Sequence, residues 1–328
     1  MRVLAAPDKF RGTATAPEVA AAFARAAVAS GARADEAPLA DGGEGTLEAL
    51  GGANRTTTVT GPLGDPVAAA WRLDRRSAVI EMARASGLEV VGGPEGNDAV
   101  AASTYGTGEL IAAAVERGAR EIIVGVGGSA TTDGGLGALR ALEPAPRLRG
   151  VDLRVACDVR LPFVEAAEVF GPQKGASPAQ VELLRRRLER LAQIFEEEYG
   201  VDVTDLPGSG AAGGLAGGLA AVGAHLEPGF DLVADAVDLD ERLEGCDLVI
   251  TGEGFVDEQS FDGKVVGGVV ALAAEMGKPV LVVAGEVMDP LPQHIEAVSL
   301  TERFGGERSR LDTLACIEEA VAERLASC

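Results

Sequence analysis

Histidine, cysteine and lysine are scarce in this sequence of 328 residues. It contains two histidines and four cysteines, and no two cysteines form a C-x-x-C pair. These counts argue against a zinc site, a disulfide framework and a histidine-based catalytic triad. Only four of the 29 basic residues are lysines, and three of them lie in glycine-containing segments, where a compact ammonium suits a phosphate or a carboxylate.

Positive charge is also in short supply. The chain carries 51 acidic and 29 basic side chains, which gives a formal net charge of −22. Such a charge repels the phosphates of nucleic acids and of anionic membranes, so neither is an expected partner. A small anionic substrate is still compatible with this net charge, provided that a local cluster of hydrogen-bond donors outweighs the repulsion from the protein's overall negative charge.

Long hydrophobic runs are absent as well. Hydrophobic residues make up 47% of the chain, but no window approaches the roughly 18 uninterrupted apolar residues of a membrane span. The N-terminal segment reaches a proline and charged residues before an apolar stretch could form a signal peptide. We therefore expect a cytoplasmic protein, which agrees with cysteines that suggest no disulfides.

The length favours two domains, and the pattern along the chain predicts an α/β architecture for both. Short apolar strands alternate with helical segments at both ends of the chain, whereas residues 56–82 form β-rich runs joined by turns. We predict a discontinuous α/β domain of residues 1–60 and 240–328, with a second α/β domain of residues 61–239 inserted into it.

Individual elements follow from periodicity and capping signals. Thr15 and Pro17 mark the start of a helix that runs to about residue 30. The charged amphipathic stretch 178–199 predicts a surface helix, and the Gly/Ala-rich stretch 208–223 favours close helix packing or approach of the backbone to a ligand. Further strands are predicted at 2–6, 36–39, 121–126, 152–157, 248–251 and 280–283, and further helices at 108–117, 265–276 and 312–325.

The strongest candidate site is the glycine-rich loop 125–135, which follows the buried strand 121–126. Ligands of open α/β sheets bind beyond the carboxyl ends of the strands. Backbone amides and hydroxyl groups of this loop could hold phosphate oxygens; the alternative is a tight strand-to-helix turn. The candidate phosphate-binding residues are Gly127, Gly128, Ser129, Thr131, Thr132 and Gly134 in this loop, and Thr107 in the helix-opening segment 105–109.

A second candidate is the acidic segment 251–264, which follows another buried strand. Mg²⁺ prefers one or two carboxylates together with water and phosphate oxygens, so Glu253 or Asp257 could hold the ion while Lys264 neutralises a phosphate. The alternative is a solvated acidic loop. Asp41 and Glu44, in an earlier glycine-rich loop, are two further candidate metal ligands.

The loop after the first strand contains an acid and two bases, Asp8, Lys9 and Arg11. The carboxylate could accept the proton of a substrate hydroxyl, and Lys9 or Arg11 could pair with a substrate carboxylate. Taken singly, such residues are more often ordinary turn and cap residues. Their coincidence with other polar loops at strand ends makes them candidates.

Two familiar nucleotide motifs are missing or weak. No G-x-x-x-x-G-K-[ST] sequence occurs, so this is not a P-loop enzyme. The segment 208–213 matches G-x-G-x-x-G, but it follows Leu206-Pro207 rather than a clear strand. An NAD-dependent hydroxy-acid dehydrogenase therefore stays an alternative only if these glycines lie on a strand–turn–helix unit.

Seven ordered motifs resemble those of the glycerate kinase type 1 family, the bacterial glycerate 2-kinases, over nearly the whole chain. They are Ala6-Pro-Asp-Lys-Phe-Arg-Gly-Thr13, Ala40-Asp-Gly-Gly-Glu-Gly-Thr46, Tyr105-Gly-Thr-Gly-Glu109, Gly127-Gly-Ser-Ala-Thr-Thr-Asp-Gly-Gly135, Phe170-Gly-Pro-Gln-Lys-Gly-Ala176, Pro207-Gly-Ser-Gly-Ala-Ala-Gly-Gly214 and the segment 251–264.

The resemblance implies a kinase that uses ATP and Mg²⁺ to convert D-glycerate to a phosphoglycerate, with 2-phosphoglycerate favoured. It also implies one flavodoxin-like domain and one further α/β domain that flank a cleft, and it is compatible with a homo-oligomer. Catalysis would consist mainly of positioning and charge neutralisation, with Asp133 or Asp8 orienting the 2-hydroxyl for in-line attack.

The chain departs from the family pattern in two places. The segment 138–152 is shorter than usual, and Cys157-Asp158-Val159 continues with Arg160-Leu161 in place of an Asn-Pro turn. A protein that binds nucleotide or glycerate without turnover is therefore a second alternative.

Overall fold

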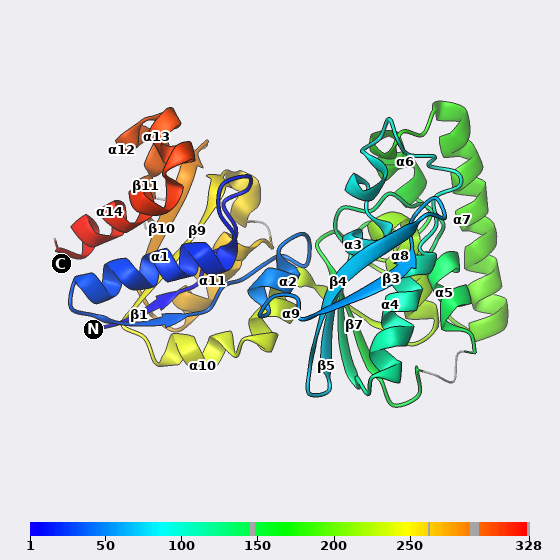
Figure 1. The fold of residues 1–328 in the computed structure, drawn as a ribbon, viewed down its shortest axis with the longest axis horizontal. Helices are drawn as coiled ribbons and strands as arrows, with labels where there is room; N and C mark the ends of the chain where they lie inside the picture. The colour runs from blue at the N-terminus through cyan, green and yellow to red at the C-terminus, as the bar shows by residue number, and fades with distance from the viewer. Residues whose placement is uncertain (145–147, 262, 289–294, 327–328) are drawn as a thin grey trace. The chain divides into compact units, whose positions relative to one another are not determined.

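The computed structural model describes residues 1–144, 148–261, 263–288 and 295–326, which form two compact units (Figure 1). The first unit comprises residues 1–41, 48–50 and 230–328, and the second comprises residues 42–47 and 51–229. The second unit is thus an insertion in the first. The predicted boundaries lay at 60/61 and 239/240, whereas the chain passes between the units near residues 41 and 229.

The first unit contains a five-stranded parallel sheet. Its strand order is β11-β10-β9-β1-β2, which reads 2-1-3-4-5 when the strands are numbered along the chain. This order is that of flavodoxin-like folds, so the predicted flavodoxin-like domain is confirmed. The strands are β1 (Arg2–Ala5), β2 (Arg33–Glu36), β9 (Leu248–Val256), β10 (Val280–Val287) and β11 (Glu296–Ser299).

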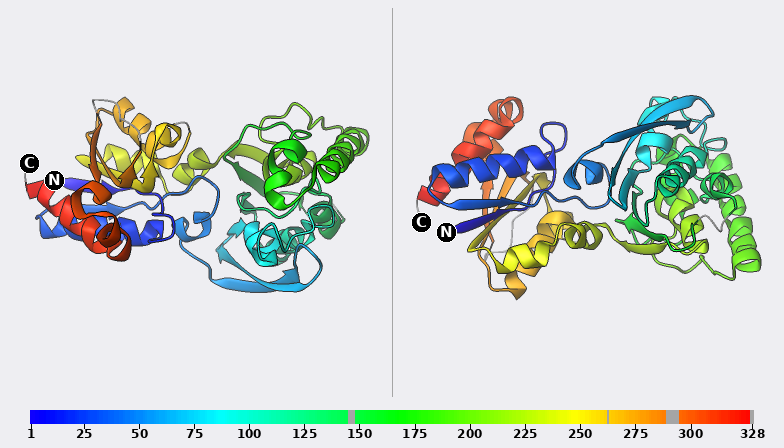
Figure 2. Two further views of the ribbon diagram at one scale, coloured as in Figure 1. Left: turned by 90° about the horizontal axis from the view of Figure 1, so that it is seen from above. Right: turned by 60° about the horizontal axis from the view of Figure 1, so that its bottom comes forward.

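Both faces of this sheet are buried, which is why its central strands are almost continuously apolar. Successive side chains point to opposite faces: Val3 and Ile250 pack with α1 and α14, whereas Leu4 and Val249 pack with α10 and α11. Figure 2 shows helices on either side of the sheet. The helices are α1 (Ala16–Ala29), α9 (Gly229–Ala236), α10 (Leu239–Glu244), α11 (Val265–Glu275), α12 (Leu300–Phe304), α13 (Gly306–Leu311), α14 (Thr313–Ala326) and the 3₁₀ turn η4 (Glu258–Phe261).

The predicted start of α1 is confirmed in detail. The Thr15 hydroxyl accepts a hydrogen bond from the Glu18 amide, and the Glu18 carboxylate accepts one from the Thr15 amide at 2.9 Å. This reciprocal pair satisfies two amide groups that the first turn of a helix leaves without partners.

The second unit contains a six-stranded mixed sheet in the order β3-β4-β5-β6-β7-β8. The strand β4 runs antiparallel to its neighbours β3 and β5, and the strands from β5 to β8 are parallel. The predicted β-rich runs correspond to the antiparallel strands. Residues 55–60, which the sequence analysis grouped with the first domain, belong here because they pair along their whole length with β4. The strands are β3 (Arg55–Thr60), β4 (Pro66–Asp74), β5 (Ser77–Glu81), β6 (Glu121–Gly125), β7 (Asp152–Cys157) and β8 (His225–Pro228).

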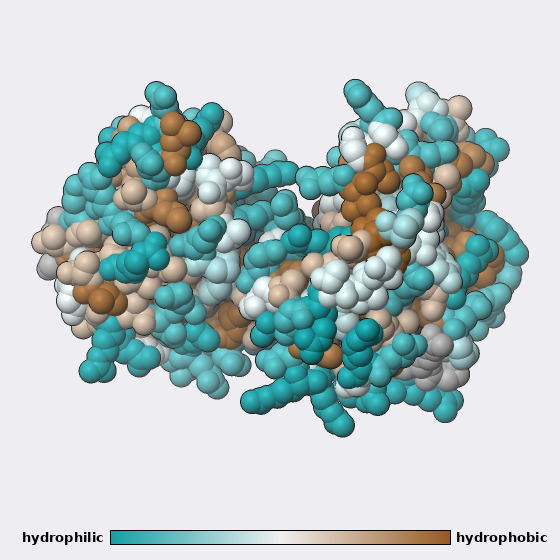
Figure 3. All heavy atoms as spheres, in the orientation of Figure 1, coloured by the Kyte–Doolittle hydropathy of each residue, from teal (hydrophilic) through white to brown (hydrophobic). Residues whose placement is uncertain are grey.

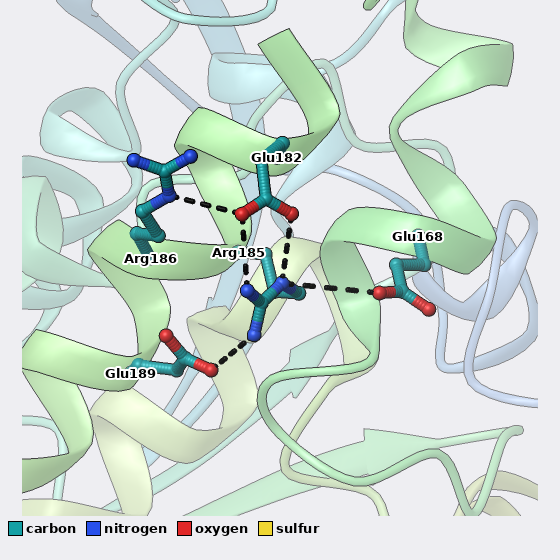
Figure 4. A network of polar contacts seen from close by, with 5 residues as sticks. All are labelled: Glu168, Glu182, Arg185, Arg186 and Glu189. Carbon is teal, nitrogen blue, oxygen red and sulfur yellow. Dashed lines mark hydrogen bonds and ion pairs between the residues drawn. The ribbon is translucent and has the colours of Figure 1, made fainter. Parts of the chain in front are cut away.

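The long helix α7 has the predicted residues 178–199 and the predicted two-faced character. On its wet face Arg185 contacts Glu182, Glu189 and Glu168, and Arg186 contacts Glu182 (Figure 4). Its opposite face packs in an apolar cluster of the same unit. The helices of the second unit are α3 (Ala83–Ser86), α4 (Tyr105–Glu116), α5 (Leu136–Leu142), α6 (Ala166–Phe170), α7 (Pro178–Tyr199) and α8 (Ala211–Ala221), with 3₁₀ turns η1 (Glu89–Val91) and η3 (Pro172–Lys174); α2 (Thr46–Ala49) lies at the passage between units.

Helix α8 confirms the prediction of close packing for the Gly/Ala-rich stretch. All of its residues are buried, and a Cβ atom at Gly217 would lie 2.5 Å from the ring of Phe163. A larger residue at this position has no room.

Several strands differ from the sequence prediction. The strands β9 and β10 run to Val256 and Val287, beyond the predicted ends at 251 and 283. The strand expected at 36–39 lies at 33–36, where it pairs in register with β1. The strands β8 and β11 were not predicted, since each has four residues and only partial burial.

The surface agrees with the acidic composition. Hydrophilic residues cover most of the face seen in Figure 3, and hydrophobic residues lie in separate groups. No helix in the described part of the chain is long and apolar enough to cross a membrane.

Candidate active site

Asp8 lies at the topological switch point of the flavodoxin-like sheet. The chain leaves β1 toward β2 on one side, while β9 pairs with β1 on the other. Beyond the end of β1 the backbone continues alongside β9, because the Asp8 amide donates to the Gly252 carbonyl at 2.9 Å. Such a crevice, outside the carboxyl ends of the strands, is where open α/β sheets bind their ligands.

The Asp8 carboxyl group is buried, with 6% of the residue exposed. Burial raises its pKa to about 7, against the opposing effect of Lys9, whose Nζ lies 3.7 Å from the carboxylate; the negative charges of Asp41 and Glu253 raise the pKa further. The Lys9 amide also donates to Asp8 Oδ1 at 2.6 Å. A carboxyl group with a pKa near neutrality is suited to accept a proton at physiological pH.

Glu253 and its neighbours stand beside Asp8 in the first unit. Glu253 Oε1 is buried and has no hydrogen-bond partner among the residues that the structure describes. Burial raises the pKa of this carboxyl group, whereas a hydrogen bond from Ser260 and the charge of Lys264 lower it. Asp257 has a different local role, because its Oδ1 accepts the Ser260 amide at 3.0 Å and thereby begins the turn η4. Lys264 directly precedes α11.

The four predicted metal ligands do not form a preassembled metal cage. No group of three or more His, Cys, Asp or Glu side chains in the described ranges could hold an ion by itself. Asp41 and Glu253 both act on the pKa of Asp8 and belong to the first unit, whereas Glu44 is an exposed residue of the second. The unpaired oxygen of Glu253 among other carboxylates still fits Mg²⁺, which needs only one or two protein carboxylates when phosphate and water complete its shell.

In the second unit, Asp133 is held by donors from two helices. Its carboxylate accepts the amide of Thr104 at 2.8 Å, the hydroxyl of Thr104 at 2.9 Å, and the amides of Gly135 and Gly137 at 3.1 and 3.2 Å. These bonds join the start of α4 to the start of α5. The lone pairs of Asp133 are therefore used in fixing the loop 125–135 to the helices that follow it.

The predicted phosphate-binding residues differ in accessibility. Gly127 and Gly128 face solvent in part, whereas Ser129, Thr131 and Thr132 are buried. A Cβ atom at Gly127 would lie 2.8 Å from the Cα of Gly43, so the loop 42–46 packs directly on this backbone.

Several hydroxyl groups around this loop have no visible role in holding the fold. Thr131 Oγ1, Thr132 Oγ1 and Ser209 Oγ are buried without a hydrogen-bond partner in the described part of the chain. Thr107 is different, because its hydroxyl bonds with that of Ser86 at 2.8 Å. Buried polar groups are normally paired, so these exceptions mark a place where a ligand or water would complete the hydrogen bonding.

Lys174, a buried cation next to the loop 125–135, was not among the predicted site residues. It is 3% exposed, and its ammonium donates to the Thr131 carbonyl at 2.7 Å. Burial lowers the pKa of Lys174 to about 7, and the charge of Asp133 opposes this shift. Asn97 ties the two segments together by donating to the carbonyls of Ala130 and Lys174. The available signals were the scarcity of lysine and the Gly-Pro-Gln-Lys-Gly sequence around it.

Glu81, at the end of β5, is a second residue that sequence reasoning missed. Its Oε1 accepts the amides of Gly45 and Leu47, both at 2.9 Å, and its Oε2 pairs with Arg84 at 2.9 Å. The buried carboxylate thus anchors the loop 42–47 to the second unit. A single glutamate after a strand carries no pattern that would have indicated this.

The 208–214 glycine segment packs against the loop 125–135. The Gly134 amide donates to the Gly213 carbonyl at 3.0 Å, and a Cβ at Gly213 would lie 2.0 Å from the Thr131 carbonyl oxygen. Ala212, Gly213 and Gly214 all have left-handed backbone angles. The segment follows turns rather than a strand, so the strand–turn–helix unit that a dinucleotide site requires is not formed here.

The departure at Arg160-Leu161 lies beside this glycine segment. The Gly210 amide donates to the Leu161 carbonyl at 2.9 Å, a bond that uses only the backbone. The Arg160 side chain is exposed. Part of the other departure, residues 145–147, lies outside the described residues.

Comparison with known proteins assigns these features to one family. The model of the glycerate kinase family matches residues 3–145 and 143–325. The chain belongs to the glycerate kinase family. It is 42% identical to a glycerate 2-kinase of Escherichia coli K12, over 88% of this chain and 86% of the relative, and 40% identical to a glycerate kinase of Bacillus subtilis 168, over 88% and 85%.

A solved structure of the family has the same fold. The crystal structure of a putative glycerate kinase 2 from Salmonella typhimurium LT2 matches with a TM-score of 0.88 and 37% sequence identity, and the match covers 100% of this chain and 98% of the other. The match therefore includes both units of this chain.

Proposed function

We propose that this protein transfers the γ-phosphoryl group of ATP to the 2-hydroxyl of D-glycerate and releases 2-phosphoglycerate and ADP. Membership of the glycerate kinase family supports the substrate class. The observation that carries the chemistry is the buried carboxyl of Asp8, whose pKa is raised to about 7 at the switch point of the sheet.

Asp8 is the better base of the two predicted candidates. A base must have a lone pair available for the substrate proton, and the Asp133 carboxylate already accepts four donors of its own loop and helices. Among the described residues, the polar contacts of the Asp8 carboxylate come from Lys9, and the carboxylate stands among other negative charges. We assign proton acceptance to Asp8 and the positioning of the loop 125–135 to Asp133.

Phosphate binding is assigned to the loop 125–135 of the second unit. Gly127 and Gly128 are partly or fully exposed, and the hydroxyls of Thr131 and Thr132 have no hydrogen-bond partner in the described part of the chain; both observations support this role. In the first unit, Lys9 and Lys264 supply positive charge that would neutralise phosphate or carboxylate groups. Stabilisation of charge, rather than covalent chemistry, is what phosphoryl transfer requires from the protein.

Magnesium belongs to this proposal as the partner of ATP. Glu253 would hold the ion through Oε1, which has no hydrogen-bond partner among the described residues. The negative charge of Asp41 acts on the Glu253 carboxyl group and would add to the attraction for the ion. When bound, the ion supplies neutralisation of the charge on the phosphate oxygens. The protein's own contribution there is to orient the partly buried Glu253 carboxylate through its hydrogen bond with Ser260 and the nearby charge of Lys264.

A direct assay tests the proposal. Purified protein should release ADP only when ATP, Mg²⁺ and D-glycerate are all present, and proton and phosphorus NMR should identify 2-phosphoglycerate as the product. A 3-phosphoglycerate signal would move the reaction to the other hydroxyl. Binding of ATP and glycerate by calorimetry without ADP release would instead show a binding protein, and a change in nicotinamide absorbance with glycerate and NAD would show a dehydrogenase.

A further inference from the structure

A cavity of about 360 Å³ opens at the carboxyl edge of the flavodoxin-like sheet in the first unit. One wall is the loop after β1, from Phe10 to Thr13, and the floor is formed by the ends of β9 and β10. The helices α12 and α13, with Thr313 at the start of α14, form the other wall. The volume lies within the range of small-molecule sites, roughly 300–1,000 Å³. Asp8 comes two positions before the lining residue Phe10 in the chain, and Glu253 comes one position before Gly254.

Two glycines, Gly254 and Gly285, allow backbone segments to pack closely at this cavity. A Cβ at Gly285 would lie 2.5 Å from the Gly254 carbonyl oxygen, and one at Gly254 would lie 3.1 Å from the Arg11 amide. The strand ends and the Arg11 loop therefore pack more closely than side chains would permit. This packing brings the Arg11 position to the edge of the sheet.

Two arginines line the cavity. Within the described ranges, the guanidinium groups of Arg11 and Arg310 make no ion pair or hydrogen bond. The other arginines of the same C-terminal segment are paired: Arg303 with Glu323, Arg308 with Glu319 and Arg324 with Glu296. In a chain with a net charge of −22, two unpaired guanidinium groups on one cavity form a local anion-binding environment.

The cavity also contains groups that suit hydroxyls. Glu286 lines it, and its carboxylate has no ion-pair or hydrogen-bond partner in the portion of the chain that is described. The hydroxyls of Thr301 and Ser309 lie 3.2 Å apart on the opposite wall. A bare phosphate would meet the negative charge of Glu286. A hydroxy acid matches both features, with its carboxylate on the arginines and a hydroxyl donating to Glu286.

We infer that this cavity is the binding site for the carboxylate end of the hydroxy-acid substrate, with Arg11 and Arg310 binding the carboxylate and Glu286 accepting a substrate hydroxyl. The inference rests on the proposed function for the identity of the acid. It adds Arg310 and Glu286 to the substrate-binding residues and assigns the specificity for a hydroxylated acid to this cavity.

Steady-state kinetics of the full chain test the role of the arginines. Arg310→Gln and Arg11→Gln should each raise the KM for D-glycerate by about tenfold or more, because each removes a charge-assisted hydrogen bond. The kcat and the KM for ATP should change by less than about twofold. Arg310→Lys should restore part of the affinity. Arg33→Gln is the matched control, because Arg33 is an exposed arginine of β2 that lies outside the cavity.

An unchanged glycerate KM in Arg310→Gln would overturn the inference. A rise in the KM for ATP alone would also overturn it and would assign the cavity to the nucleotide. Thermal unfolding of each variant should match the wild type, since neither guanidinium group makes an ion pair or a hydrogen bond with the described residues.

Calorimetry keeps this test independent of catalysis. Wild-type protein should bind D-glycerate more tightly than propionate, which has the carboxylate without hydroxyls, and Glu286→Gln should reduce that preference. If the wild type binds glycerate in an Arg310-dependent way but releases no ADP, the proposed function fails and the cavity assignment stands. Absence of glycerate binding to the wild type would overturn the cavity assignment.

Discussion

Asp8 of the first unit and Asp133 of the second occupy similar places and have different surroundings. Both follow a buried parallel strand and stand in a loop before a helix. Asp133 accepts four donors from Thr104, Gly135 and Gly137, whereas Asp8 is buried beside one lysine and among other carboxylates. The hydrogen bonds of Asp133 stabilise the fold around it. The burial of Asp8 raises the pKa of its carboxyl group toward neutrality, where the group can exchange a proton.

The largest effect should come from Asp8→Asn. Removing the proton acceptor should lower kcat by about 10²–10⁴-fold while the KM for ATP stays near the wild-type value. The coupled ADP-release assay measures both constants. Asp152→Asn, at an exposed position at the start of β7, is the matched control and should keep wild-type turnover. Full turnover of Asp8→Asn would remove this residue from catalysis.

Asp133→Asn should act mainly on stability. The side-chain amide cannot accept all the donors that now converge on the carboxylate, so we expect a loss of about 1–3 kcal/mol in the free energy of unfolding. Urea denaturation measures it, with Asp152→Asn again as the control. An unchanged unfolding midpoint together with a collapse of kcat in Asp133→Asn would reverse the roles that we give to the two aspartates.

The pH dependence of stability should also reveal the raised pKa of Asp8. With a pKa raised from 3.8 to about 7, Asp8 binds more protons in the folded state than in the unfolded state between these values. Its contribution is therefore most favourable below about pH 4 and is lost as pH rises through 7, at up to about 1.4 kcal/mol per pH unit. Asp8→Asn should reduce this fall in denaturation experiments at a series of pH values. An identical pH profile in wild type and variant would contradict the raised pKa.

Lys174→Met should change the pH dependence of stability in the direction opposite to that of Asp8→Asn. The pKa of Lys174 is lowered from 10.5 to about 7, so the unfolded state binds more protons between these values and stability due to Lys174 rises with pH over that range. Methionine removes this pH dependence. It also removes the hydrogen bond to the Thr131 carbonyl, and the loss of that bond should lower the free energy of unfolding by about 1 kcal/mol. Denaturation at pH 7 and pH 9 measures it. A variant whose stability still rises over this interval as in the wild type would show that another group is responsible.

Much of the fold could be predicted because the relevant signals are local. The capping residues of α1 and the amphipathic repeat of α7 lie within the helices that they define, and both were confirmed. The short strands β8 and β11 could not be found in this way. Four residues with partial burial carry no reliable alternation, so their pairing with β7 and β10 decides their conformation.

The candidate site was predictable only as a set of loops. Asp8 and Asp133 were equal candidates for the same role, because both follow buried strands. What separates them is the number of donors, and those of Asp133 include Thr104, which lies 29 residues away in the chain. Glu81, Asn97 and Lys174 were missed for the same reason, since most of their partners lie 33 to 77 residues away.

The sequence by itself determined which loops carry glycine, acid and base, and the order of those loops was enough to indicate the family. These signals are local. Tight turns after strands favour glycine, and carboxylates at such positions are typical of sites that bind phosphate together with a metal ion. Only the tertiary structure decided which carboxyl groups have a raised pKa, and which arginines make no ion pair within the described residues. These properties depend on burial and on charges that folding brings together from distant parts of the chain.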